Sequence, residues 1–269
     1  MLGSSRESLA ACSAALDARR QAPGFDELAG QLYAVAAVLD DNGQLRSTLA
    51  DSGQLSSVRE SLIRDILGGK VSDVTLDVVL DAVDRRWSED IDLVVALEQL
   101  AAQAAFTVAE ADGSLDATEE EIFRFGRAVD ASAELQMALG DPAQTPATKA
   151  AIVRDLLSDR ATAATRQVLE ATVGRLHGQR LDAAIDTLCE LAARQRERVV
   201  AEVRVAAPLT EEQARRLASA LSALKGRTVR LNVAIDSAVL GGVMVTIGDE
   251  VIDGTVASRL EQARRAILG

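Results

Sequence analysis

The chain has 269 residues, a length that suits two or three domains better than one small one. Hydrophobic residues make up 48% and charged residues 26%, which is typical of a folded globular protein and excludes a disordered one. The formal net charge of −12 argues against nucleic acid as a partner, and the 2% of aromatic residues favours closely packed helices over a β-sandwich.

Two features bear on compartment and membrane attachment. The two cysteines, Cys12 and Cys189, are too few for a disulfide framework or a four-thiolate metal site, and they fit a reducing compartment. No stretch reaches the roughly 20 apolar residues of a membrane-spanning helix, and the amino terminus lacks the basic and apolar regions of a signal peptide. We therefore expect no direct membrane insertion, so that any membrane association comes through another protein.

An internal repeat organises most of the chain. Residues 35–95 match residues 125–185 without a gap at an offset of 90 positions, and thirteen of the 61 positions are identical. The alternative is that two amphipathic helical regions resemble each other by composition alone. Because polar identities such as Thr75 with Thr165 align together with the apolar ones, the pattern favours duplication.

Each copy has the apolar spacing of helices. Leu28, Leu32, Val35 and Leu39 follow one another at steps of three and four, and this predicts about five or six short helices per copy, packed as a bundle. Three pairs of residues indicate helix starts by their capping spacing or by proline at the first helical position: Ser57 with Glu60, Thr118 with Glu121, and Thr145 with Pro146.

From Val199 onward the apolar period changes to two, which is typical of half-buried strands. The predicted fold class is therefore mainly α, with two tandem helical bundles followed by a small α/β domain. The predicted strands are 199–205, 229–235 and 243–247, with a helix that starts at the Thr210 to Gln213 capping box and a closing helix over about residues 255–268. The predicted domains are residues 1–105, 106–198 and 199–269.

Few residues point to catalysis. The single histidine, His177, aligns with Trp87 of the other copy, and a position that accepts either ring favours packing at a helix end over a catalytic base. Cys189 lies in an apolar run, where a small buried hydrophobe is the expected role.

An acidic segment has part of the spacing of a calcium loop. Its glycine, Gly113, and its last carboxylate, Glu119, stand six residues apart, but the first ligand position would be Val108. We therefore interpret the segment as a helix start, where carboxylates oppose the positive end of the helix dipole. Its polar residues are Glu110, Asp112, Ser114 and Asp116.

The glycines near the carboxyl end do not form a phosphate loop. Gly241 and Gly242 precede a strand and Gly248 follows it, whereas phosphate loops place glycines between a strand and a helix. We expect three acidic residues nearby to lie in a turn and at a helix start, where capping is their role: Asp249, Glu250 and Asp253. The sequence thus predicts no catalytic residue, no cofactor and no metal ion.

Residues 235–260 read IDSAVLGGVMVTIGDEVIDGTVASRL, an aspartate, a glycine pair, an alternating strand, a Gly-Asp turn and a last aspartate before a helix. This resembles the carboxyl-terminal signature of the delta subunit of F-type ATP synthases, equivalent to the mitochondrial oligomycin sensitivity conferral protein. The matching positions are Asp236, Gly241, Gly242, Val245, Gly248, Asp249, Ile252 and Asp253. The pattern from Leu45 to Val71 and its second copy look like the family's amino-terminal helical domain. The duplication resembles the extended, unfused form of actinobacterial members.

The resemblance implies a non-catalytic stator connector. The family binds the amino-terminal helices of the alpha subunits through its helical domain and the carboxyl-terminal part of the b stalk through its α/β domain, and so keeps the catalytic head from turning. It implies a peripheral position on the cytoplasmic side of the cell membrane. The alternative is a helical-repeat scaffold or regulatory adaptor unrelated to ATP synthase, which copurification with alpha and b would distinguish. An enzyme is the third choice.

The resemblance also implies candidate partner-binding residues. In that family the first and fifth bundle helices form the groove for the alpha helix. We expect the second copy to bind alpha because it adjoins the α/β domain, with the two helices at roughly residues 119–129 and 166–176. The candidate residues are Ile122, Phe123, Gly126, Val168, Leu169 and Val173. The alternative for each is that it only fills its own core.

Overall fold

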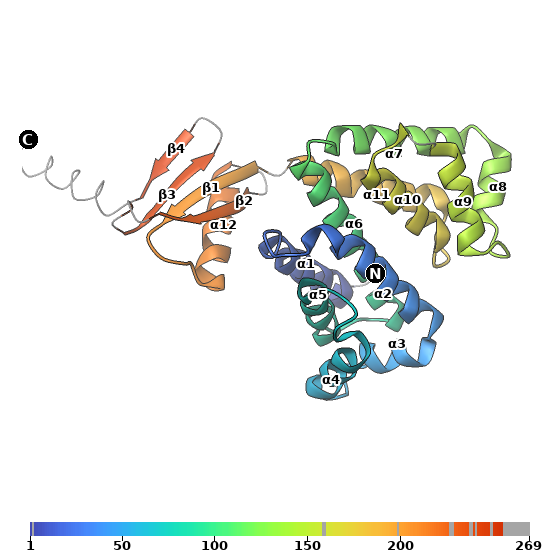
Figure 1. Cartoon of the computed structure of the whole chain (residues 1–269), viewed down its shortest axis with the longest axis horizontal. Helices are drawn as coiled ribbons and strands as arrows, with labels where there is room; N and C mark the ends of the chain where they lie inside the picture. The colour runs from blue at the N-terminus through green and yellow to red at the C-terminus, as the bar shows by residue number, and fades with distance from the viewer. Residues whose placement is uncertain are drawn as a thin grey trace, which may run out of the picture. The chain divides into compact units, whose positions relative to one another are not determined.

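A computed structural model describes residues 1, 3–157, 160–197, 199–225, 229–236, 239, 241–247 and 250–254. The chain divides into two compact units, Met1–Arg196 and Glu197–Gly269. The first is entirely helical and the second is a small α/β unit (Figure 1), which confirms the predicted fold class. The helices of the first unit are α1 (Gly3–Ala18), α2 (Phe25–Asp41), α3 (Gly43–Ala50), α4 (Ser56–Leu67), α5 (Asp73–Asp84), α6 (Asp90–Ala111), α7 (Leu115–Asp130), α8 (Ala133–Gly140), α9 (Pro146–Leu157), α10 (Ala163–Gly174) and α11 (Leu181–Glu197).

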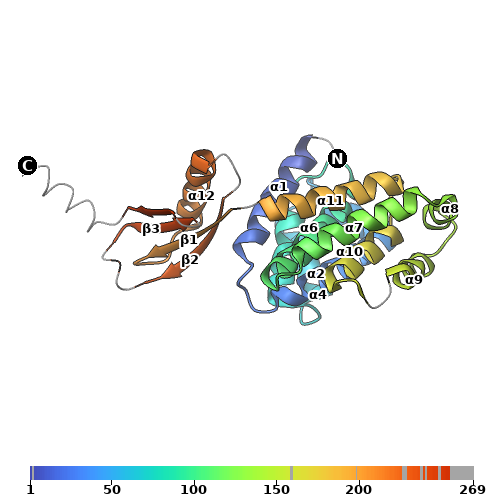
Figure 2. The same cartoon turned by 90° about the horizontal axis from the view of Figure 1, so that it is seen from above.

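The repeat appears in the structure as two sets of helices in the same order. An offset of 90 residues places α2, α3, α4 and α5 on α7, α8, α9 and α10. The same offset places α1 on α6, so α6 is both the last helix of the first bundle and the first helix of the second. Figure 1 shows α6 running from the α1–α5 group to the α7–α11 group, and Figure 2 shows the same helices from above.

Helix α6 forms the centre of the helical unit. It contacts α2 on the side of the first bundle and α7 and α10 on the side of the second, and 14 of its 22 residues are buried. Contrary to the expectation that no stretch of the chain would qualify, α6 is by length and composition alone long and apolar enough to cross a membrane. Its burial among other helices is that of a core helix. The predicted boundary at residues 105 and 106 falls within α6, and the separation of the two bundles as domains stays a prediction.

The predicted helix starts had different outcomes. Pro146 is the first residue of α9, and the Thr148 amide donates to Thr145 Oγ1 at 3.2 Å, as expected. The Thr210 box is also confirmed, because the Thr210 and Gln213 amides each donate to the other side chain. The other two predictions were wrong, because α4 begins one residue before Ser57 and α7 begins three residues before Thr118.

The α/β unit contains a four-stranded sheet in the order β2-β1-β3-β4. Strands β1 and β2 are parallel, β3 is antiparallel to β1, and β4 forms a hairpin with β3. Helix α12 (Glu211–Lys225) connects the two parallel strands and packs against β2. The strands are β1 (Val199–Val205), β2 (Val229–Ile235), β3 (Val243–Ile247) and β4 (Glu250–Asp253).

The prediction that Glu250 and Asp253 lie in a turn and at a helix start is wrong. Both lie in β4, where Asp253 pairs with Met244 of β3. The run was missed because only Val251 and Ile252 in it are apolar, too few to show a period. The predicted closing helix at residues 255–268 lies outside the described residues.

Candidate partner-binding site

The described part of the chain holds no cluster of three or more histidine, cysteine, aspartate or glutamate side chains arranged for a metal ion. In the acidic segment, Asp112 Oδ1 accepts a hydrogen bond from the Ser114 amide at 2.9 Å, and Gly113 has a φ of +80°. These contacts form the tight turn between α6 and α7. Ser114 and Asp116 lie at the start of α7, as expected, but Glu110 and Asp112 lie at the carboxyl end of α6.

The signature residues of the α/β unit have mainly backbone roles. Gly241 and Gly242 have φ values of +134° and +84°, in the region that favours glycine, and they lead the chain into β3. Val245 is buried at the centre of β3 and pairs with the half-buried Ile252 of β4. The Asp236 amide donates to the Val205 carbonyl at 2.9 Å where β2 ends. Asp253 lies in β4, and Gly248 and Asp249 lie outside the described residues.

The six candidate residues of the second bundle do not together line an open groove. Four of them are fully buried, and Gly126 lies against α11, where an added Cβ would stand 3.1 Å from Ile185. Phe123 is the exception, because 58% of it is exposed. The four buried residues are Ile122, Val168, Leu169 and Val173. Three of the six lie on α7, which was expected to be the first helix of the second bundle. The repeat makes α7 the second helix of that bundle and α6 the first.

A groove of about 440 Å³ lies beside α10 instead, between α2, α9 and α10. Small residues line it on all three helices, and we call it the α2–α9–α10 groove. On its α2 wall, a Cβ added at Gly30 would stand 3.3 Å from Gln167 Nε2 of α10, so the glycine leaves room for that side chain. Its small lining residues are Gly30, Ala34, Ala37, Ala147, Ala150, Ala171 and Gly174.

Tyr33 also lines the groove, and its hydroxyl oxygen is buried without a hydrogen-bond partner among the described residues. Burial, together with the negative charge of Glu98, raises the pKa of Tyr33 above its ordinary value. At the repeated position the second copy has Phe123, which is exposed. The same repeat position is therefore half-buried in the first copy and exposed in the second.

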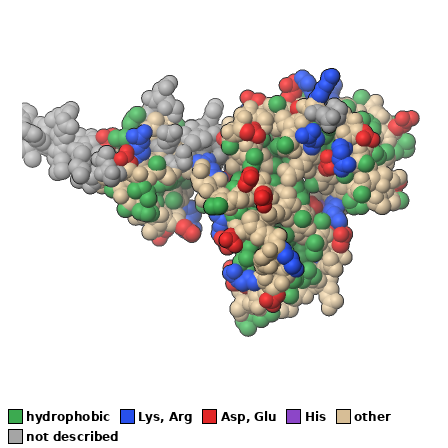
Figure 3. Space-filling view, in the orientation of Figure 1, with side chains coloured by type: hydrophobic (Ala, Val, Ile, Leu, Met, Phe, Trp, Pro, Cys, Tyr) green, Lys and Arg blue, Asp and Glu red, His purple; other side chains and the backbone are tan. Residues whose placement is uncertain are grey.

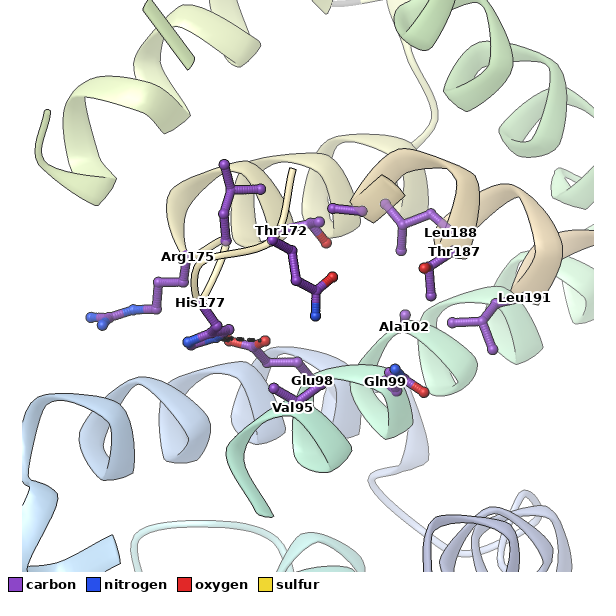
Figure 4. Close-up of a pocket in the computed structure, with 13 residues that line it drawn as sticks. Val95, Glu98, Gln99, Ala102, Thr172, Arg175, His177, Thr187, Leu188 and Leu191 are labelled. Carbon is purple, nitrogen blue, oxygen red and sulfur yellow. Dashed lines mark hydrogen bonds and ion pairs between the residues drawn. The ribbon is translucent and has the colours of Figure 1, made fainter. Parts of the chain in front are cut away.

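Charged side chains join the two bundles next to the groove. His177, in the turn between α10 and α11, lies 2.9 Å from both carboxylate oxygens of Glu98 on α6 (Figure 4). Its Nδ1 is 3.5 Å from Asp40 of α2. Arg175 donates to Asp40 at 2.6 Å and to Asp41 at 2.8 and 2.9 Å. We call these five residues the junction cluster.

Contacts within the junction cluster shift the pKa values of its members. Burial lowers the pKa of His177, but the hydrogen bond and charge of Glu98 and the charge of Asp40 outweigh it, so the pKa lies above its ordinary value. Burial raises the pKa of Glu98. The hydrogen bond from Arg175 lowers the pKa of Asp41. His177 at this helix end is thus an ion-pair partner, which its alignment with Trp87 did not indicate. Trp87 has a different contact, because its Nε1 donates to the Ala82 carbonyl.

In the α/β unit, exposed apolar residues lie at one end of the sheet. Val233 and Ile235 of β2 are 40% and 64% exposed. They pair with Val203 and Val205 of β1 and therefore share the sheet face that packs on α12. Val251 is 57% exposed and lies on the opposite face, because its partner in β3 is Thr246.

The visible surface shows no large area of one charge. In Figure 3 acidic and basic side chains are interspersed over the described part of that face, together with hydrophobic patches. A basic stripe of the kind that binds nucleic acid is not seen on it.

The chain is similar in sequence to known proteins over its whole length. Residues 97–267 match the family described as ATP synthase delta (OSCP) subunit. The chain is 42% identical over 271 residues to the ATP synthase subunit delta of Streptomyces griseus, covering 100% of both chains. It is 42% identical over 265 residues to that of Streptomyces avermitilis, covering 98% of this chain and 97% of the relative.

A chain of the Toxoplasma gondii mitochondrial ATP synthase hexamer, solved by cryo-EM, aligns with 64% of this chain and 98% of that chain, at 20% identity and a TM-score of 0.28. The family match begins within α6 and covers the second bundle and the α/β unit. The Streptomyces relatives match over the first bundle as well.

Proposed function

The chain belongs to the ATP synthase delta (OSCP) subunit family, and from this membership we propose how it connects the parts of that complex. It is a non-catalytic delta subunit of the F-type ATP synthase and a peripheral part of a membrane-bound complex. In the proposal, the helical unit binds the amino-terminal helices of the alpha subunits. The α/β unit binds the carboxyl-terminal region of the b stalk, on the cytoplasmic side of the membrane.

The observation that carries the alpha contact is the α2–α9–α10 groove. An amphipathic helix binds by placing its apolar face in a hydrophobic groove. Alanine and glycine on all three walls leave room for the backbone of such a helix to approach closely. The groove lies along α10, the fifth helix of the second bundle, which the resemblance implies is one of the two docking helices. Its other walls differ from the expected ones, because α2 and α9 supply them and the first helix, α6, contributes only Glu98. The extra bundle thereby contributes directly to the binding of alpha.

The core residues predicted as contacts act indirectly in this proposal. Val168, Leu169 and Val173 anchor the inner side of α10 and so hold the groove wall in place. Ile122 anchors α7 in the same way. Gly126 permits the close approach of α7 to α11. Phe123 remains a direct candidate contact on a second surface, the outer side of α7.

A calorimetric titration of the full chain with a peptide of the alpha amino terminus tests the groove. Ala147→Leu and Ala171→Leu, which fill the groove, should each weaken binding at least about tenfold, equal to about 1.4 kcal/mol. Ala128→Leu makes the same change at an exposed position of α7 and should leave the affinity unchanged.

Phe123→Ser distinguishes the two helical surfaces. Because Phe123 is exposed, the substitution should leave the fold intact and, if alpha binds in the groove, should not change the affinity. Unchanged binding by both groove variants together with weakened binding by Phe123→Ser would transfer the contact to α7. Met137 of α8, which is 68% exposed, gives the control Met137→Ser.

The b contact is proposed at the exposed apolar side chains of Val233 and Ile235, at one end of the sheet. Exposed apolar residues that adjoin a buried core are typical of protein interaction sites. Ile235→Glu should weaken binding of a soluble b fragment by about tenfold or more, since it would bury a charge in the contact. Val251→Glu places the same charge on the opposite face and serves as the control. Equal affinities for the two variants would exclude this patch.

A further inference from the structure

The junction cluster has a feature that the stator role does not use. His177 is the one histidine of the chain, and its side chain is 7% exposed although it lies in a turn. His177 itself has a φ of +49°, an uncommon backbone conformation for a residue with a side chain. The surrounding contacts therefore fix both its backbone and its ring. Figure 4 shows the ring directed from the turn after α10 toward Glu98 of α6.

The charges around His177 come from each element that packs there. Helix α6 supplies Glu98, and α2 supplies Asp40, with Asp41 beside it. Helix α10 ends at Gly174, and the next residue, Arg175, lowers the pKa of His177 but pairs with both aspartates. On α3, Arg46 lies 3.8 Å from Asp40 and 3.1 Å from Asp90 of α6. Without a proton on His177, this group holds four carboxylates against two guanidinium groups.

We propose that His177 is a proton-operated latch between the two bundles. When the imidazole is charged, it bridges Glu98 and Asp40 and holds the α10–α11 turn against α2 and α6. When the proton leaves, Glu98 keeps a buried negative charge without its cation, and leaving one partner of a buried pair alone is strongly unfavourable. The turn then opens, and with it the position of α10 relative to α2 becomes less fixed.

The sign of the pH dependence follows from the direction of the shift. The pKa of His177 in the folded chain lies above the ordinary value of about 6.5. The stabilisation is therefore complete below about pH 6.5 and is lost as the pH rises through the folded-state pKa. The burial of Glu98 works in the same direction, because it raises the pKa of that carboxyl group and so makes its negative charge costly at higher pH. The latch is closed in mildly acidic solution and opens in alkaline solution.

Glu98 and Arg175 of the junction cluster also line the α2–α9–α10 groove. The test of the latch nevertheless needs no partner, because it follows the imidazole and the turn in the chain alone. Because His177 is the only histidine, its ring protons can be followed by NMR in the full chain without assignment of other signals. The expected result is a pKa above 6.5. A value at or below 6.5 would overturn the proposal, and this measurement uses the unsubstituted chain, so it stands even if a variant does not fold.

Hydrogen–deuterium exchange, corrected for the intrinsic rate at each pH, measures the opening of the α10–α11 turn directly. Protection of residues 175–181 should fall between about pH 6 and pH 9 by about tenfold for each unit by which the folded-state pKa exceeds 6.5. In His177→Gln the protection should be low at both pH values. Asp182→Asn removes an exposed ion pair with Arg180 just beyond the same turn and should keep the pH dependence. A pH dependence that persists in His177→Gln would contradict the latch.

Discussion

Gln31 and Glu121 stand at the same repeat position, 90 residues apart, and each holds the start of a helix in its own bundle. Gln31 Oε1 accepts from the amide and the hydroxyl of Ser72, at 2.8 and 3.0 Å. Glu121 Oε2 accepts from the Thr162 amide at 3.0 Å and from Thr165 Oγ1 at 2.6 Å. The duplication thus extends to individual hydrogen bonds that join the second helix of each bundle to the fifth.

Glu121→Ala should lower the free energy of unfolding by about 1–3 kcal/mol, because it removes two hydrogen bonds to a carboxylate and leaves the Thr162 amide without this acceptor. Urea denaturation of the full chain measures the change. Glu120→Ala, one residue earlier, removes only an exposed ion pair with Arg124 and should cost less than about 0.5 kcal/mol. Equal losses in the two variants would contradict a capping role for Glu121.

Arg59 is a second repeated position with a structural role. It is 4% exposed, and its guanidinium donates to the Val83 carbonyl at the end of α5 and to the Leu49 carbonyl of α3. Its counterpart in the second copy is Lys149, which is 5% exposed. A buried cation at this position interacts favourably with helix carboxyl ends.

Arg59→Met should therefore destabilise the chain by about 2–3 kcal/mol, since two carbonyl groups lose a charged donor. Arg59→Lys, which installs the residue of the second copy, should recover at least half of that loss. Thermal and urea unfolding measure both variants. The exposed Arg64, on the same helix, gives the control Arg64→Met, with a change within about 0.5 kcal/mol.

The two thiols should react at different rates. Burial raises the pKa of the Cys12 thiol to about 11, and Cys12 is 1% exposed. Burial also raises the pKa of Cys189, which is only half-buried. Because the thiolate is the reactive form, a thiol reagent at about pH 8 should label Cys189 first and leave Cys12 unlabelled until the chain unfolds. Mass spectrometry of the labelled peptides, with a sample in denaturant as control, identifies the order.

Tyr33→Phe tests the unpartnered hydroxyl in the groove. Near neutral pH the substitution should leave stability unchanged or raise it by up to about 1 kcal/mol, since no hydrogen bond is lost. The pKa of Tyr33 is raised in the folded chain, so above about pH 10 the unfolded state ionises first and the chain loses stability. That loss should be smaller in Tyr33→Phe. Urea midpoints at neutral pH and at about pH 10.5 give the comparison.

Much of the fold could be predicted from local patterns. The repeat, the helical spacing and the change to a two-residue period near Val199 predicted the helices and three of the four described strands. Strand β4 was missed because it depends on pairing with β3 and has little pattern of its own. Capping was predicted correctly only where both partners are close in sequence, as at Thr210; Glu121 instead caps a helix 41 residues away.

The candidate site was less predictable than the fold. The candidate contacts of α10 are apolar residues. The most apolar positions of an amphipathic helix are the ones that the core of its own domain buries, as at Val168 and Leu169. The groove residues are alanines and glycines, such as Ala171 and Gly174, which carry little signal in a sequence.

By itself the sequence determined which segments are helices or strands, that the bundle occurs twice, and which family signature ends the chain, because these depend on residues near one another. Only the tertiary structure decided that α6 belongs to both bundles and that His177 meets Glu98. It also decided that Tyr33 is half-buried where Phe123 is exposed. Equivalent positions of the repeat share the same helical spacing, but their surroundings depend on contacts with distant segments, and those differ between the first copy and the second.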